Sequence, residues 1–125
     1  MTPTGKRLLI VEDDFYLRDV FRLMLEDAGY NVLEASTGAE AITVVEQEHP
    51  DLVFLDLGLP DCDGLEVARK LKTGPQPSGS IIIALTGRVG TAEKRACLEA
   101  GCKAHFAKPI SPKDMLRRLP DLLNL

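Results

Sequence analysis

The stretch that decides the fold is Leu8-Leu9-Ile10-Val11-Glu12-Asp13-Asp14, in which four apolar residues are followed directly by three acids. A short run that is apolar at every position is typical of a strand buried on both faces of a sheet. Beyond it, Leu17, Phe21, Met24 or Leu25, and Ala28 recur at helical spacing, and Gly29 is a typical helix stop. The pattern predicts a strand, an acidic turn and a helix capped by Asp13 or Asp14.

The same unit repeats along the chain. We expect further strands at 31–35, 52–55, 81–85 and 104–107, and further helices at 38–48, 65–72, 91–100 and from 111 onward. The strand at 31–35 is more polar than the others, which favours a place near an edge of the sheet. Single helices between strands indicate right-handed βαβ units and a parallel sheet covered on both sides. The predicted fold is therefore α/β, a doubly wound five-stranded parallel sheet in a three-layer sandwich.

Two local signals refine this outline. Ser111 and Pro112 are a typical N-cap and first residue of a helix, and Pro120 is expected to kink that last helix or end it early. Residues 73–80 read TGPQPSGS and are expected to form a surface loop instead of a domain boundary, because little chain lies beyond them.

Composition places the chain among ordinary globular proteins. It has 125 residues, 45% hydrophobic and 27% charged, which suits a single domain spanning 1–125 without a separate output domain. No apolar run approaches the roughly 20 residues of a membrane span, and no signal peptide is visible. An odd count of three cysteines without paired spacing predicts reduced thiols and no Cys/His metal site. We expect a cytoplasmic protein that does not bind membranes.

Charge is distributed unevenly. Residues 1–63 carry 14 acids and 4 bases, whereas residues 64–125 carry 5 acids and 11 bases, for a net charge of −4. An overall acidic domain argues against direct binding of nucleic acid. An acidic half can simply be a solvated surface, but several of these acids follow buried strands, where a carboxylate needs compensation.

Four predicted strands end in polar groups that the fold brings to one edge: Glu12-Asp13-Asp14, Asp56, Thr86 and Lys108. Crowded carboxylates need positive charge, and oxygen ligands with retained waters suit Mg²⁺. A dication, a lysine and a hydroxyl are also the groups that bind a phosphoryl group, and Asp56 is the best candidate for a nucleophile that forms an acyl phosphate. Taken singly, the acids could be a helix cap, Thr86 a turn residue and Lys108 a surface lysine.

The motifs IVEDD (10–14), LDLGLPDCDG (55–64), ALTG (84–87) and AKPI (107–110), in this order, resemble the response-regulator receiver domain of two-component signalling. The resemblance covers essentially the whole chain. It implies a flavodoxin-like (βα)5 fold with the strand order 2-1-3-4-5 known for the chemotaxis receiver. It also implies phosphorylation of the chain by a partner protein.

The resemblance assigns roles residue by residue. Asp56 is the phosphoacceptor, and Mg²⁺ is held by Asp13, Asp56, the backbone carbonyl of Gly58 and, through a water, Glu12. Thr86 and Lys108 bind the phosphoryl group, and a cis peptide bond precedes Pro109. Asp14 is expected to be a cap or surface residue only.

Two positions depart from the family pattern. His105 stands where the family usually has Tyr or Phe as a switch residue, a departure common in receivers of hybrid sensor kinases; the alternative is a solvent-facing histidine without that role. Gly58 leaves no side chain beside the acyl phosphate.

The resemblance also implies partners. The phosphoryl donor is expected to be a sensor histidine kinase or a histidine phosphotransfer protein, docking beside the first helix near Phe15 and Leu17. An output protein of unknown identity is expected to bind the face built by 91–100, 104–107 and the last helix. That face is basic, with Lys94, Arg95, Lys103, Lys113, Arg117 and Arg118.

Three alternatives compete with a signalling receiver that is not an enzyme. A Mg²⁺-dependent phosphohydrolase needs a second Asp two residues after its nucleophile, where this chain has Gly58. A flavin or nucleotide module needs Gly, Ser or Thr in the loop that holds acids at 12–14. An interaction module that is never phosphorylated would be marked by loss of Asp56 or Lys108, and both are present.

Overall fold

A computed structural model describes residues 5–73, 79–87 and 90–123. The described elements alternate strictly between strand and helix. They are β1 (Arg7–Val11), α1 (Phe15–Asp27), β2 (Asn31–Ala35), α2 (Gly38–Glu48), β3 (Leu52–Asp56), α3 (Gly64–Thr73), β4 (Ile81–Thr86), α4 (Thr91–Glu99), β5 (Ala104–Ala107) and α5 (Pro112–Leu122). Most of the predicted loop 73–80 lies outside the described residues.

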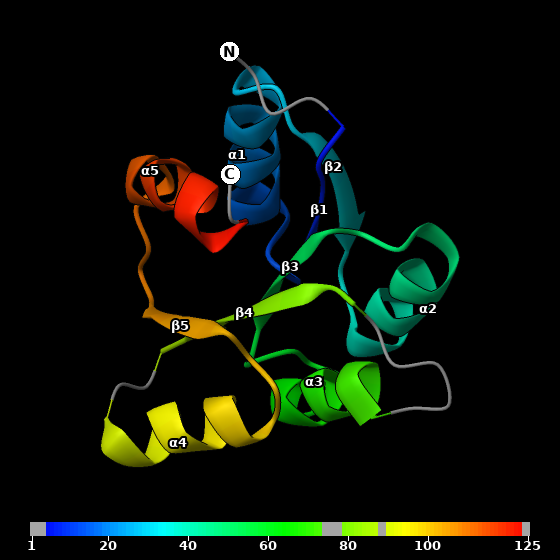
Figure 1. The fold of residues 1–125 in the computed structure, drawn as a ribbon, viewed down its shortest axis with the longest axis vertical. Coiled ribbons are helices and arrows are strands. Elements are labelled where there is room, and N and C mark those ends of the chain that lie inside the picture. Colours follow the sequence, from blue (N-terminus) through cyan, green and yellow to red (C-terminus); the bar gives the residue numbers. More distant parts are fainter. Residues whose placement is uncertain (1–4, 74–78, 88–89, 124–125) are drawn as a thin grey trace.

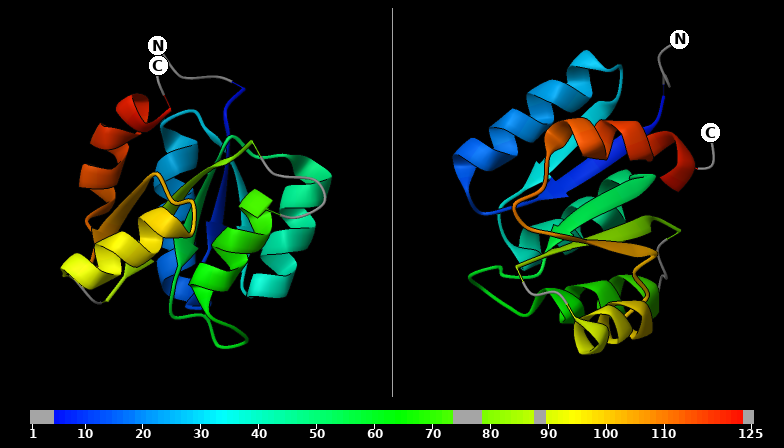
Figure 2. Two further views of the ribbon diagram at one scale, coloured as in Figure 1. Left: turned by 60° about the horizontal axis from the view of Figure 1, so that its bottom comes forward. Right: turned by 90° about the vertical axis from the view of Figure 1, so that its left-hand side faces the viewer.

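The five strands form one parallel sheet in the order β2-β1-β3-β4-β5. This is the order implied by the resemblance, and β2 lies at an edge as its polar sequence predicted. Figure 1 shows α1 and α5 together on one side of the sheet and α2, α3 and α4 on the other, and the right-hand view of Figure 2 shows the same layers edge-on. The predicted three-layer α/β sandwich is confirmed.

Two apolar cores, one on each face of the sheet, hold the layers together. Alternate residues of one strand point to opposite faces, so Leu9 and Val11 pack with α2, α3 and α4 while Leu8 and Ile10 pack with α1 and α5. The central strands are therefore apolar at nearly every position, as the sequence indicated. Packing on both faces holds the strands in place and so fixes the positions at which the following loops begin.

Helix ends follow the sequence signals, with one exception. Asp14 caps α1 by accepting hydrogen bonds from the backbone N–H groups of Tyr16 and Leu17, and Gly29 has a φ of 100° just beyond its end. Ser111 caps α5 with Pro112 at its start. However, α5 does not end early at Pro120 but continues to Leu122. Buried Leu119 and Leu122 on the same helix pack against the sheet and explain this, since packing outweighs the missing backbone donor.

Among the described residues, no helix is both long and apolar enough to cross a membrane.

Two leucines of α1 give a matched test of the core. Leu25 is 1% exposed in the core beneath α1, whereas Leu23 is 53% exposed on the same helix. Leu25→Ala is expected to lower the free energy of unfolding by about 2–5 kcal/mol because it leaves a cavity. Leu23→Ala is expected to change it by less than about 0.5 kcal/mol. Urea unfolding followed by circular dichroism measures both, and equal losses in the two variants would contradict the placement of α1.

Candidate phosphoryl and metal site

The site lies at the carboxyl edge of the sheet because the strands end in register. Val11 of β1 pairs with Leu55 of β3, so the next residues, Glu12 just beyond β1 and Asp56 at the end of β3, lie side by side. On the other flank, Thr86 of β4 pairs with Ala107 of β5, which precedes Lys108. The backbone N–H of Lys108 donates to the carbonyl of Thr86 at 2.8 Å and fixes this flank.

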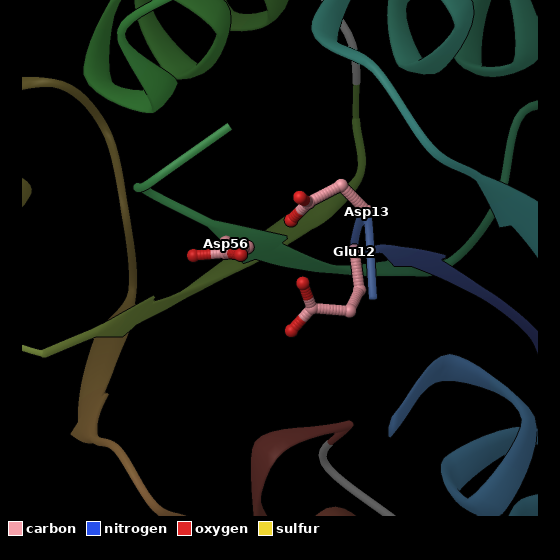
Figure 3. A group of neighbouring side chains, drawn as sticks. All are labelled: Glu12, Asp13 and Asp56. Carbon is pink, nitrogen blue, oxygen red and sulfur yellow. The ribbon is translucent and has the colours of Figure 1, made fainter. Parts of the chain in front are cut away.

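Three carboxylates converge at this edge. Single oxygens of Glu12, Asp13 and Asp56 all lie within 4.8 Å of one another, and Figure 3 shows the side chains pointing toward a common space. Glu12 and Asp56 are each 3% exposed, whereas Asp13 is exposed. Two buried carboxylates and one at the surface form an oxygen-rich group of the kind that hard divalent cations bind.

Lys108 reaches into this cluster from the end of β5. Its Nζ lies 2.8 Å from Oδ1 of Asp56 and 3.4 Å from Oε1 of Glu12. Backbone donors assist: the N–H of Gly58 donates to Oδ1 of Asp56 at 2.9 Å, and the N–H of Asp14 donates to Oε2 of Glu12 at 3.3 Å. One ammonium group and two N–H dipoles thus face three carboxylates, and the cluster keeps an excess of negative charge.

The pKa values follow from this geometry. Burial, reinforced by the hydrogen bond with Asp56, raises the pKa of Glu12 to about 7. Burial also acts to raise the pKa of Asp56, but its hydrogen bonds with Lys108, Glu12 and Gly58 outweigh burial and lower it. Burial acts to lower the pKa of Lys108, and the contacts with Asp56 and Glu12 outweigh it and raise that pKa. Asp56 and Lys108 are therefore both held in their charged forms.

The predicted site residues line one open pocket of about 750 Å³. The predicted site residues in its lining are Glu12, Asp13, Asp56, Gly58, Thr86 and Lys108. Thr86 is buried, with 6% of its surface exposed. The peptide bond between Lys108 and Pro109 is cis, the isomer expected from the resemblance.

His105 does not line this pocket. It lies in β5, half-buried, and pairs with Ala84, two residues before Thr86 on β4. Since alternate residues of a strand share a face, His105 and Thr86 lie on the same face of the sheet, the one covered by α4. The structure thus places His105 beside the site and not in it.

Two residues that support the site were not anticipated from the sequence. Arg18 of α1 donates through Nη1 to the backbone carbonyl of Glu12 at 2.7 Å. Asp61, in the loop after β3, accepts hydrogen bonds from the N–H groups of Gly38 and Ala39 and so attaches this loop to the start of α2. Helical spacing places Arg18 one turn after the cap Asp14, which is the only sequence signal for its contact; nothing local indicates the contact of Asp61.

Comparison with known proteins agrees with this geometry. Residues 8–120 match the family model described as the response regulator receiver domain. The chain is 38% identical over 119 residues to the phosphate regulon transcriptional regulatory protein PhoB of Pseudomonas aeruginosa, covering 95% of this chain and 52% of that protein. It is 34% identical over 106 residues to the polar-differentiation response regulator DivK of Brucella ovis, covering 85% and 86%. The chain therefore spans about half the length of PhoB but most of DivK.

Among solved structures, a CheY-like response regulator receiver domain protein of Methanospirillum hungatei superposes with a TM-score of 0.86 at 35% identity, covering 95% of this chain and 94% of that one. The chemotaxis response regulator CheY4 of Vibrio cholerae gives 0.87 at 26% identity, covering 95% and 99%. With a matched family model over most of its length and the acidic pocket at the expected strand ends, the chain belongs to the response regulator receiver domain family of two-component signalling, whose members accept a phosphoryl group.

Proposed function

We propose that Asp56 is the residue that accepts the phosphoryl group, from a phosphohistidine on a sensor histidine kinase or a histidine phosphotransfer protein. The observation that carries this assignment is the contact set of Asp56. Its carboxylate is buried at the floor of an open pocket, held by Lys108 at 2.8 Å and by the Gly58 N–H at 2.9 Å. Burial and fixed donors hold the nucleophile in one orientation, which is what an in-line displacement requires.

The residues of the cluster suit Mg²⁺. Asp13, Asp56 and the backbone carbonyl of Gly58 would hold the ion directly, and Glu12 would hold it through a water. The closeness of the three carboxylates, with one lysine to offset them, supports this assignment. When bound, Mg²⁺ would neutralise oxygens of the incoming phosphoryl group.

The transfer itself exchanges one bond for another. An oxygen of Asp56 forms a bond to phosphorus while the bond from phosphorus to the histidine nitrogen breaks, and the departing imidazole takes a proton from solvent. Lys108 and Gly58 both contact Oδ1 of Asp56, so we assign the attack to Oδ2. Lys108 then donates to an oxygen of the bound phosphoryl group, and the hydroxyl of Thr86 donates to another.

The acquired charge would act as a switch. Thr86 moves toward the new phosphoryl oxygens, and His105, on the same face of the sheet, fills the space that Thr86 leaves. The change reaches the face built by α4, β5 and α5, whose six basic side chains are all exposed. We propose that an acidic surface of an output protein binds there.

The donor protein would dock beside α1. Phe15 is 62% exposed and Tyr16 is 81% exposed, and in the sequence they stand between Asp14 and Leu17, which line the pocket. Leu17, expected to contribute to the same surface, lines the pocket but is half-buried and packs partly against the core. We therefore assign most of the apolar contact to the exposed rings of Phe15 and Tyr16, with Leu17 beside them in the lining of the pocket.

We propose that the chain acts as a signalling receiver and assists only its own phosphorylation and dephosphorylation. Gly58 has no side chain to act as the acid or base of a phosphohydrolase. The proposal also includes a cytoplasmic location, no direct contact with nucleic acid or membrane, and a single receiver domain over 1–125. PhoB is a transcriptional regulator by name, and this chain matches about half of it.

Incubation with Mg²⁺ and acetyl phosphate, followed by intact mass spectrometry, tests the phosphoacceptor. The wild-type chain is expected to gain one phosphoryl group, and Asp56→Asn is expected to gain none because the amide is not a nucleophile. Asp121→Asn, which changes an exposed carboxylate on α5, is the matched control and is expected to be phosphorylated normally. If Asp56→Asn still gains the mass of a phosphoryl group, Asp56 is not the phosphoacceptor.

Mg²⁺ is also expected to stabilise the unphosphorylated chain, because it binds only the assembled pocket. At an ion concentration about 100 times the dissociation constant, the free energy of unfolding is expected to rise by about 2.7 kcal/mol. Asp13→Asn removes one carboxylate ligand and is expected to abolish most of this gain, whereas Asp121→Asn keeps it. Urea unfolding with Mg²⁺ and with EDTA measures the effect, and the same gain in Asp13→Asn would exclude Asp13 as a ligand.

A further inference from the structure

One peptide group joins the two acids that follow β1. The carbonyl of Glu12 and the N–H of Asp13 belong to the same plane, so its rotation sets where both side chains point. The backbone N–H of Glu12 donates to the carbonyl of Ala35 on β2 at 3.0 Å. The carbonyl of Glu12 accepts from Nη1 of Arg18 at 2.7 Å. The backbone at Glu12 is thus held from both sides.

Among the described residues, the carboxylate of Asp13 lacks the side-chain and backbone donors that hold the carboxylates of Glu12 and Asp56, so its placement depends more on this peptide group. Lys108 contacts both Glu12 and Asp56, and the Gly58 N–H also contacts Asp56. Within residues 5–73, 79–87 and 90–123, no protein donor contacts the carboxylate of Asp13. The position of this exposed side chain and the direction of its Cα–Cβ bond are therefore set by its own backbone.

Arg18 is itself held in place. Its Nε donates to Oε1 of Glu34 on β2 at 3.2 Å, and its guanidinium lies 5.6 Å from the centre of the Phe15 ring. Only 16% of its side chain is exposed. The planar guanidinium donates in two directions at once, so it connects α1, β2 and the end of β1, which a lysine ammonium does less well.

We infer that Arg18 is a positioning residue for the metal site: it fixes the peptide between Glu12 and Asp13 and so holds the Asp13 carboxylate toward Glu12 and Asp56. The inference rests on the magnesium site of the proposed function. It assigns to Arg18 no contact with the phosphoryl group or the ion.

Arg22 offers a matched control on the same helix. It pairs with Asp19 at 2.5 Å, with Glu26 at 2.8 Å and with Glu34 at 3.7 Å. It therefore shares Glu34 with Arg18, but its described contacts do not include the backbone of Glu12. Removing either arginine deletes one positive charge, which by Coulomb's law alone would tighten Mg²⁺ binding slightly. If Arg18 positions the metal site, removing it should instead weaken Mg²⁺ binding, whereas removing Arg22 should not.

The experiment measures the Mg²⁺ dissociation constant of the unphosphorylated chain by NMR titration, following the amide signals of Asp13 and Gly58. Arg18→Gln is expected to weaken binding about tenfold, the size typical of losing a group that orients a metal ligand. Arg22→Gln is expected to bind as the wild type does or slightly more tightly. Arg18→Lys keeps the charge but not the two-directional contact, and its affinity is expected to fall between those of the wild type and Arg18→Gln.

An Arg18→Gln variant that binds Mg²⁺ with wild-type affinity overturns the inference. Equal losses of affinity in Arg18→Gln and Arg22→Gln also overturn it, because they would indicate a general effect of α1. The amide spectra report whether each variant is folded; should Arg18→Gln not fold, wild-type affinity in Arg18→Lys overturns the inference. If the wild-type chain itself does not bind Mg²⁺, the magnesium site of the proposed function fails, and the inference fails with it. If the wild-type chain binds Mg²⁺ and the Arg18 variants bind it with the same affinity, the inference about Arg18 fails but the magnesium site stands.

Discussion

The ion pair between Lys108 and Asp56 is the interaction on which the rest of the site depends. Two unit charges about 4 Å apart interact by about 4 kcal/mol at an effective dielectric constant of 20, and like charges repel by as much. Lys108 contacts both Asp56 and Glu12, but one ammonium does not offset all the negative charge of the acidic cluster, even though burial raises the pKa of Glu12 to about 7. The pocket is therefore stable enough to form and still favours a further cation, and these are the two properties that a magnesium-assisted phosphoacceptor needs.

The fold makes this concentration of charge possible. Leu55 of β3 pairs with Val11 of β1 and Ala84 of β4, so the strand ends are held in register by buried backbone contacts. Apolar cores on both faces stabilise the sheet, and the acidic groups of the site lie at its carboxyl edge. Because the stability resides in the cores, the edge can hold side chains that repel one another. The separation of the two roles explains how one small domain tolerates several carboxylates close together.

Local patterns in the sequence predicted most of the fold, because apolar periodicity, caps and glycine stops act over a few residues. They also placed Glu12, Asp13, Asp56, Thr86 and Lys108 at one edge, since parallel strands end together. The failures concern tertiary contacts. Pro120 does not end α5, because neighbouring core residues hold the helix to the sheet. The contact of Asp61 with α2 joins residues 22 and 23 positions apart, and no local pattern encodes such a pair.

The pocket has two unlike halves. On the β1 side, the backbone of Glu12 is held by Ala35 and by Arg18. On the other side lie the side chains of Thr86 and Lys108, to which we assign phosphoryl binding. Their strands β4 and β5 pair from Ile83 with Ala104 to Thr86 with Ala107. A charge added at Asp56 would act on side chains that can turn, while the backbone of Glu12 stays held by Ala35 and Arg18. Such an asymmetry directs the response toward β5 and its neighbouring helices, where the exposed basic face lies, and away from α1, where the donor would dock.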